Sequence, residues 1–381
     1  MHKYITNTSK IKLNHLKLNA IPDLNPKLQT LLTKMQSAFS ANLKIELGNA
    51  KINYINKMFQ EFITNILEIT KSKFESDINS MDNCISIKLY IGSDIIQLNF
   101  IFDKAELVDY IKYIAVIVHA TNTFCHLFPH NYNKLEMNVC LDSNERNIDI
   151  PSHIQTVKNK IAYLQAESTA FNVSGVTYPH RRIINLTRRE EMIKLLFHEL
   201  IHFIGLDHVL VQANFKNKWA AKLDGGLNLS EAYTEFFSVI LYATYESVHL
   251  SKLIPEKSDD IFKEILATEI NYGIRLTSNI LKFYDYDTQT YRNFFDGIGQ
   301  KITQPILLVE YIFLRTILFL HLDEVLELIS ADYRIQTNNL SDLSKIFLDD
   351  SELITKLEPL MINKMDKSVS YLAIDLDWSL V

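Results

Sequence analysis

Hydrophobic residues recur with two different spacings along the chain. Across residues 54–74 apolar side chains recur at the spacing of an amphipathic helix, and residues 1 to about 80 are predicted to form a helical N-terminal region. From residue 85 the period becomes two. Residues 85–91 alternate, Gly92, Ser93 and Asp94 turn the chain, and residues 95–102 continue as a second strand, which predicts a β-hairpin. Residues 105–124 then read as a long apolar helix and residues 135–141 as a further strand.

The next segment predicts two short strands that lead into a helix. Residues 171–178 and 182–186 have the β-branched and aromatic content of strands. Thr187 and Glu190 form a capping box, which predicts that a helix begins there, and Gly205 is a natural C-terminal stop for it. Beyond about residue 209 the pattern indicates no further strand, and the rest of the chain is expected to be helical.

The predicted helix carries the candidate chemistry of the chain. It contains His198-Glu199-Leu200-Ile201-His202, and histidines four residues apart lie on one face of a helix. Two neutral imidazoles so placed can bind one Zn²⁺, and Glu199 can reach a water that the metal holds. A zinc-bound water beside a carboxylate base is the working part of metal-assisted peptide hydrolysis.

An edge strand, a second strand and then a helix with this motif resemble the zincin metallopeptidases. The third zinc ligand separates two groups of zincins. His208 completes the sequence His-Glu-x-x-His-x-x-Gly-x-x-His of the metzincins. Metzincins also have a methionine turn not far downstream, whereas the first methionine after His208 is Met361.

The rival segment, residues 230–237, reads Ser-Glu-Ala-Tyr-Thr-Glu-Phe-Phe and resembles the second motif of the gluzincins. This resemblance implies Glu231 as the third zinc ligand and Glu235 as the acid that hydrogen-bonds His198, the first zinc histidine. The helix around these acids is apolar and should be buried, and a buried carboxylate needs a partner or a metal. We therefore favour Glu231 and keep His208 as the alternative ligand, with Asp207 either in a polar loop or beside a ligand.

The residue that would stabilise the oxyanion stays open. Zincins usually supply it as a His or Tyr from the second half of the domain. The available side chains are Tyr233, Tyr242, Tyr245, His249, Tyr272 and Tyr291.

Composition narrows the class of protein. The chain has 381 residues, of which 47% are hydrophobic and 22% charged, as in ordinary globular proteins. A net charge of −6 gives no reason to expect a nucleic acid or an anionic membrane as partner. The three cysteines are scattered and are expected to be reduced thiols. The N-terminus lacks the apolar run of a signal peptide, and the apolar run at 306–322 contains Glu310 and Arg315, so we expect an intracellular or cytoplasmic protein without a membrane span.

The sequence thus predicts an α+β, zincin-like fold. A helical region at 1–80 precedes an upper subdomain at 81–208, with a small mixed sheet, a backing helix and the metal helix. A mainly helical subdomain at 209–381 would carry the third ligand. The predicted function is that of a zinc-dependent metallopeptidase with one zinc per chain and a peptide or protein substrate. The alternatives are a catalytically silent zincin-like binding or scaffold protein and a zinc hydrolase that acts on a non-peptide bond. The oligomeric state stays open.

Overall fold

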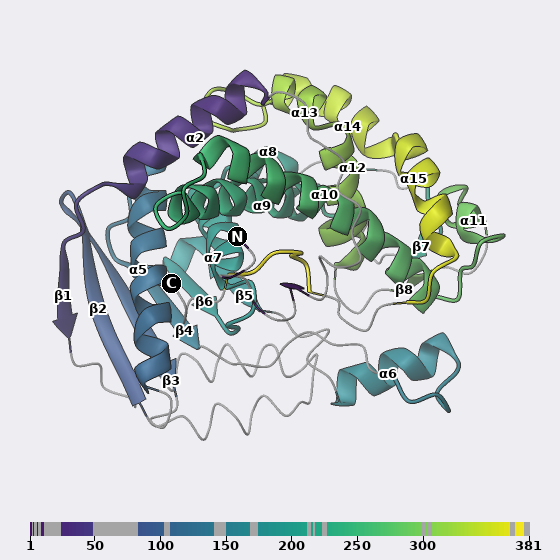
Figure 1. Ribbon diagram of the computed structural model, residues 1–381, viewed down its shortest axis with the longest axis horizontal. Helices are drawn as coiled ribbons and strands as arrows, with labels where there is room; N and C mark the ends of the chain where they lie inside the picture. The colour runs from purple at the N-terminus through teal and green to yellow at the C-terminus, as the bar shows by residue number, and fades with distance from the viewer. Residues whose placement is uncertain are drawn as a thin grey trace.

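A six-stranded mixed sheet forms one layer of the computed structural model (Figure 1). The strand order is β1-β2-β3-β4-β6-β5, with β3, β4 and β6 parallel to one another and the other neighbours antiparallel. The strands are β1 (Ile45–Gly48), β2 (Asn83–Ile91), β3 (Asp94–Phe102), β4 (Leu135–Cys140), β5 (Gly175–Tyr178) and β6 (Ile183–Leu186).

The structure describes most of the chain. The described residues are 1, 3, 6, 9–10, 24–48, 83–102, 107–140, 150–167, 174–211, 215, 218–222, 227–298, 302–303, 307–365 and 370–376. The amphipathic helix predicted at 54–74 and residues 171–173 of the predicted strand lie outside them.

The predicted hairpin is confirmed as β2 and β3, which pair through Ile91 and Asp94 around Gly92. A buried polar ladder crosses the sheet from these strands: Asn99 Nδ2 donates to Asn138 Oδ1 at 2.9 Å, and Asn138 Nδ2 donates to Asn185 Oδ1 at 3.0 Å. Because a shift of one residue would turn these amides to the other face, the ladder helps to fix the strand register.

Two central helices pack on the sheet. The predicted backing helix is confirmed as α5 (Leu107–Leu127), which contacts β2 and β3, and the motif helix α7 (Met192–Ile204) contacts β5 and β6. The two helices also contact each other. A further helix, α6 (Val157–Glu167), precedes β5, and a short 3-10 turn, η2 (Pro179–Arg181), joins β5 to β6.

The start of α7 corrects the predicted capping box. The helix begins at Met192, and its N-cap residue is Glu191 in a left-handed conformation with φ 59°. Thr187 makes no cap, because its hydroxyl donates to the carbonyl of Ser174 at 3.1 Å and joins the β6 end to β5. The predicted stop is confirmed: Gly205 is the C-cap at φ 65°, a conformation that favours glycine.

The second half of the chain is mainly helical, as predicted. The structure departs from the prediction of no further strand at two short segments, β7 (Ala221–Lys222) and β8 (Ile302–Thr303), which pair in parallel. The helices are α8 (His208–Val211), α9 (Leu229–Leu250), α10 (Ser258–Phe283), α11 (Tyr291–Phe295), η3 (Val309–Leu314), α12 (Arg315–Leu320), α13 (Leu322–Leu328), η4 (Thr337–Asn339), α14 (Leu340–Leu348) and α15 (Ser351–Met361).

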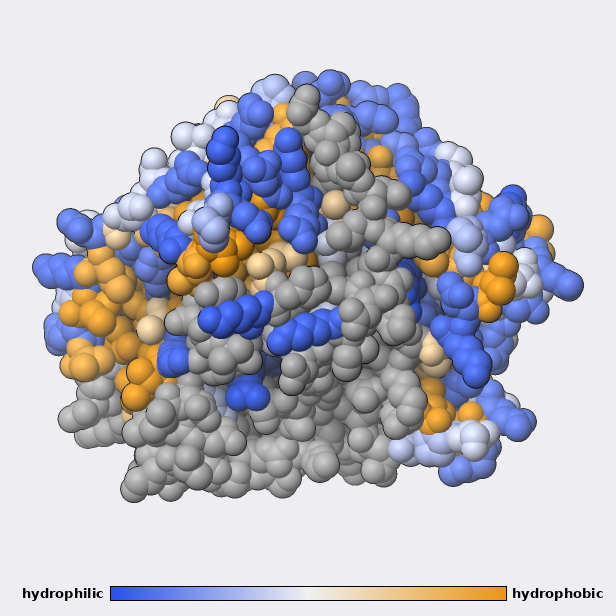
Figure 2. Space-filling model, viewed as in Figure 1, coloured by the Kyte–Doolittle hydropathy of each residue, from blue (hydrophilic) through white to orange (hydrophobic). Residues whose placement is uncertain are grey.

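The described part of the N-terminal region contains both a helix and a strand. Helix α2 (Pro26–Phe39) packs on α5 and α9, whereas β1 joins the sheet as an edge strand beside β2, so this region is not wholly helical. Apolar side chains gather over β1 and β2 at the left of Figure 2. Leu47, on β1, is 73% exposed. The boundary predicted at residue 80 stays a prediction.

Within the predicted apolar run, residues 309–320 form the helical segments η3 and α12, most of whose side chains are buried. Glu310 and Arg315 are buried within it. Within the part of the chain that the structure describes, no helix combines the length and the apolar character needed to cross a membrane. With its mixed sheet, packed helices and helical second half, the structure is consistent with the predicted α+β class.

Candidate metal centre

Two buried helices bring three potential metal ligands together. Helix α7 supplies His198 and His202 from one face, and the first turn of α9 supplies Glu231. The two Nε2 atoms lie 3.1 Å apart, and Glu231 Oε2 lies 3.3 Å from Nε2 of His198 and 3.4 Å from Nε2 of His202. Among the described residues, these three side chains form the group of His, Cys, Asp and Glu whose ligand atoms converge.

The triangle of ligand atoms has the size that tetrahedral zinc requires. Zinc binds imidazole nitrogen and carboxylate oxygen at about 2.0–2.2 Å, so two ligand atoms of a tetrahedral site lie about 3.3–3.6 Å apart. The three separations of 3.1, 3.3 and 3.4 Å are close to that spacing. His202 and Glu231 have side chains that are 17% and 19% exposed, so this corner of the molecule keeps access to solvent.

Each histidine is oriented by a second carboxylate. His198 Nδ1 bonds Glu235 Oε2 at 3.0 Å, and His202 Nδ1 bonds Asp207 Oδ2 at 2.8 Å. When each Nδ1–H donates to its carboxylate, each Nε2 presents a lone pair toward the other and toward Glu231. Asp207 therefore orients His202 in the way that Glu235 orients His198. The sequence alone does not decide whether Asp207 lies in a polar loop or beside a ligand.

Three potential acceptor atoms, the two Nε2 atoms and Glu231 Oε2, face one another, and a cation between them would stabilise this arrangement. Glu231 Oε2 is buried and makes no hydrogen bond in the structure, which is costly unless a proton or a metal ion satisfies it. Burial lowers the pKa of His202, but the carboxylates of Asp207 and Glu231 outweigh it and hold that pKa well above its usual range. Burial raises the pKa of Glu231, but both histidines outweigh it and hold it well below its usual range. The donor set and the orphaned oxygen thus fit a divalent metal ion.

The carboxylate of Glu199 lies against the edge strand β5. Thr177, on β5, places its hydroxyl 2.7 Å from Glu199 Oε2 and 2.9 Å from the Glu199 carbonyl oxygen. Gly175, two residues earlier on the same face, leaves the space for the carboxylate, because a Cβ there would lie 2.5 Å from Glu199 Oε1. Burial raises the pKa of Glu199. A carboxyl group that Thr177 holds in place beside the two histidines is suited to accept and release a proton.

His208, the alternative third ligand, is exposed at the start of α8 and lies outside the group formed by His198, His202 and Glu231. The turn at Gly205 places Asp207 on His202 instead. Of the two candidate residues, the structure therefore places Glu231, and not His208, beside Nε2 of both histidines.

The aromatic residues considered as oxyanion donors are engaged away from the ligands. The hydroxyls of Tyr233, Tyr242, Tyr272 and Tyr291 lie 2.6–3.4 Å from the carbonyl oxygens of Tyr333, Ile374, Ser370 and Ile354, respectively. Tyr245 OH bonds His119 Nδ1 at 2.9 Å, and His249 packs on Phe39 and Tyr245.

Sequence reasoning missed Tyr311, whose ring lies edge-on to the His198 imidazole with centroids 5.9 Å apart. Tyr311 lies in η3, a π-helical segment, and such segments are frequent at functional sites. Burial and the nearby carboxylates, Glu231 first among them, raise the pKa of Tyr311 well above its usual range, so its hydroxyl keeps its proton. No short-range pattern marks a π-helical turn, and the residue enters the site only through the packing of η3 on α9.

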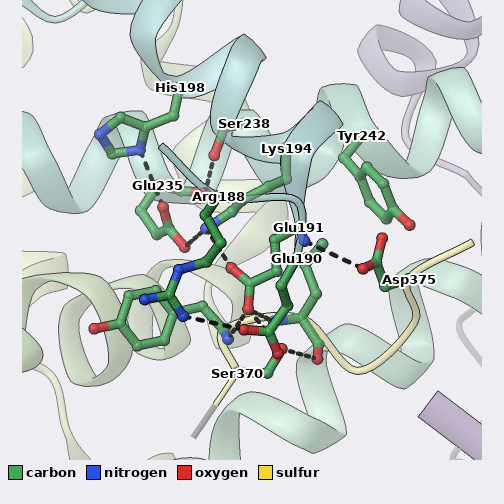
Figure 3. Close-up of polar contacts among 12 residues, drawn as sticks. Arg188, Glu190, Glu191, Lys194, His198, Glu235, Ser238, Tyr242, Ser370 and Asp375 are labelled. Carbon is green, nitrogen blue, oxygen red and sulfur yellow. Dashed lines mark hydrogen bonds and ion pairs between the residues drawn. The ribbon is translucent and has the colours of Figure 1, made fainter. Parts of the chain in front are cut away.

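A buried ionic cluster surrounds Glu235 (Figure 3). Glu235 Oε1 accepts from Lys194 Nζ at 2.7 Å and from Arg315 Nη1 at 3.2 Å. Burial raises the pKa of Glu235, but Lys194, His198 and Arg315 outweigh it and keep the carboxylate ionised. In the sequence, Arg315 is a charge within a long apolar run, a pattern that argues against a membrane span but does not identify Glu235 as its partner.

The chain is similar to a viral protein. It is 34% identical over 355 residues to an uncharacterized protein of Acanthamoeba polyphaga mimivirus, an alignment that covers 92% of this chain and 91% of the viral protein. No family model and no solved structure matches the chain. Identity at this level over nearly the whole of both proteins shows that the chain belongs to the same family as the mimivirus protein.

Proposed function

We propose that the protein is a zinc-dependent metallopeptidase with a gluzincin-like ligand set. The observation that carries this proposal is the convergence of His198, His202 and Glu231 next to the buried carboxylate of Glu199. The mixed sheet with β5 beside the motif helix, and a second helix that supplies an acid, support a zincin-like fold.

The proposed ligands are Nε2 of His198, Nε2 of His202 and a carboxylate oxygen of Glu231. Zinc held by two imidazoles and one carboxylate would lower the pKa of a water and polarise a substrate carbonyl. Glu235 and Asp207 would keep both imidazoles in the tautomer that leaves Nε2 unprotonated.

Glu199 is the proposed general base. Thr177 holds Oε2, so Oε1 would take the proton from the attacking water and then deliver it to the leaving nitrogen. Tyr311 is the proposed hydrogen-bond donor to the developing oxyanion, since its ring packs on the ligand His198.

An extended peptide is the substrate that the position of β5 favours. This strand is the last of the sheet order, and Thr177 within it contacts the proposed base. A peptide that added to β5 as a further strand would pass directly beside Glu199.

Gly175→Ala should lower the rate of peptide hydrolysis by roughly 100-fold, because the added Cβ would displace the Glu199 carboxylate while the zinc ligands stay in place. Gly273→Ala is the matched control: its Cβ would crowd Thr316 Oγ1 at 2.7 Å and leave Glu199 alone. Steady-state kinetics with metal analysis checks this. Equal losses in both variants would contradict the role of Gly175.

Tyr311→Phe should lower kcat by roughly 100-fold with zinc still bound, as expected when one donor to an oxyanion is removed. Tyr291→Phe, which removes a hydroxyl that lies 3.4 Å from the Ile354 carbonyl oxygen, serves as the control and should keep full activity. A Tyr311→Phe enzyme with wild-type kcat would show that another group stabilises the oxyanion.

Zinc affinity should fall as the pH falls from about 8 to about 6, by up to about tenfold per pH unit for each proton displaced. In the metal-free protein the pKa values of His198 and His202 are raised, so zinc must displace protons that a free imidazole would already have lost. The same raised pKa values stabilise the metal-free fold at low pH, and that contribution is lost as pH rises through them. Calorimetry in buffers of different ionisation enthalpy measures the protons released; zinc binding without proton release near pH 6 would contradict the ligand assignment.

Cleavage of a peptide mixture tests the proposed function. Zinc-loaded protein should generate new peptide termini that mass spectrometry detects, a chelator should abolish the cleavage, and added zinc should restore it. Zinc-loaded protein that leaves every peptide intact would contradict a peptidase and favour the scaffold or non-peptide alternatives.

A further inference from the structure

The carboxylate of Glu235 divides its two oxygens between different partners (Figure 3). Oε1 is bound by two cations, Lys194 at 2.7 Å and Arg315 at 3.2 Å, and Oε2 faces Nδ1 of His198 at 3.0 Å. The side chains of Lys194, Arg315 and Glu235 are 3%, 1% and 2% exposed, so water does not screen these contacts. With Oε1 fixed by two cations, Oε2 has one orientation, which is the one that meets the imidazole.

The same two cations reach the C-terminal segment, residues 370–376. Arg315 Nη1 donates to the carbonyl of Tyr371 at 2.7 Å, and Lys194 Nζ lies 5.3 Å from the centroid of the Tyr371 ring. Lys194 also pairs with Glu191 at 3.2 Å, and Glu191 Oε1 accepts from the Ser370 hydroxyl and from the amide of Tyr371.

Two cations and two carboxylates lie together in this cluster. Lys194 and Arg315 carry two positive charges, and Glu191 and Glu235 carry two negative ones, all in side chains at most 4% exposed. Loss of one member would leave an uncompensated buried charge, which the remaining groups could relieve only by moving. A movement of Glu235 is transmitted directly to His198.

We propose that Lys194 and Arg315 are positioning residues for His198, and that through Tyr371 they make metal affinity depend on the C-terminal segment. This inference rests on the proposed zinc site. The cations touch neither the ligand atoms nor the proposed base, so their effect should appear in zinc affinity itself and not only in activity.

Zinc dissociation constants, measured in competition with a chromophoric chelator, test the proposal. Arg315→Met and Lys194→Met should each weaken zinc binding 10- to 100-fold, the range typical of partners beyond the ligands. Arg188→Met is the matched control, because Arg188 is equally buried but pairs with Glu190 at 3.3 Å. An equally large loss of zinc affinity in Arg188→Met would overturn the proposal, because removal of any buried charge would then weaken zinc binding.

A double-mutant cycle separates positioning from general destabilisation. If the cations act through Glu235, zinc affinity in Arg315→Met/Glu235→Gln should equal that of Glu235→Gln alone, whereas losses that multiply would overturn the proposal. Arg315→Lys, which keeps the charge, should recover most of the affinity, and binding as weak as in Arg315→Met would contradict positioning by charge. The visible spectrum of the Co²⁺-loaded variants should shift in Arg315→Met and stay unchanged in Arg188→Met.

A separate substitution tests the link between the two cations and the C-terminal segment. Tyr371→Leu keeps the backbone contacts and removes the ring beside Lys194, so zinc affinity should fall by up to about tenfold. Unchanged affinity would overturn the link to the C-terminal segment. A wild-type protein that binds no zinc would instead refute the proposed function, and one that binds zinc equally in all these variants would refute this inference alone.

Discussion

Glu199→Gln should lower peptide hydrolysis by roughly 1,000-fold and leave zinc bound. The amide keeps the size of the side chain but cannot take a proton from water, and general base catalysis typically contributes about 100- to 10,000-fold. The ligand atoms of His198, His202 and Glu231 do not involve this group. Single-turnover kinetics on the zinc-loaded variant, with metal analysis of the same sample, provides the measurement.

Glu190→Gln is the control for this substitution, because Glu190 pairs with Arg188 and lies away from the ligand atoms. It should keep nearly full activity. A Glu199→Gln protein that hydrolyses peptides at the wild-type rate would show that the base is another residue.

Glu231→Gln should weaken zinc binding by more than about 100-fold, beyond the loss expected from a partner outside the ligands. It removes the one negative charge among the three converging ligands and replaces a strong zinc donor by a weak one. His208→Ala should leave zinc affinity unchanged, because His208 is exposed and lies outside the ligand group. Equilibrium dialysis of the two variants against buffered zinc distinguishes them. The opposite result, an empty site in His208→Ala and a filled one in Glu231→Gln, would make the chain metzincin-like.

Local patterns in the sequence predicted several elements of the fold. The period-two hairpin at 85–102, the long helix that became α5 and the stop at Gly205 all depend on residues close in sequence, and the structure confirms them. The capping box predicted at Thr187 was wrong because the Thr187 hydroxyl donates to the carbonyl of Ser174, the residue before β5. Tertiary contacts of this kind override a local signal.

The residues that complete the site depend on contacts between distant segments. Arg315 reaches Glu235 across 80 positions and Lys194 reaches it across 41, and no spacing in a sequence encodes such pairs. Thr177 and Glu199 meet because β5 packs on α7, and Tyr311 meets His198 because a π-helical turn packs on α9. The hydroxyls of Tyr233, Tyr242 and Tyr272 lie beside carbonyl groups elsewhere in the core, and these contacts also join segments far apart in the sequence.

Metal analysis of the purified protein tests the central claim most directly. The account predicts about one zinc per chain in the wild type, as expected of a site with two imidazoles and a carboxylate, and almost none in His202→Ala. A wild-type chain that holds no zinc after exposure to it, or a His202→Ala chain that retains the full amount, would contradict the account.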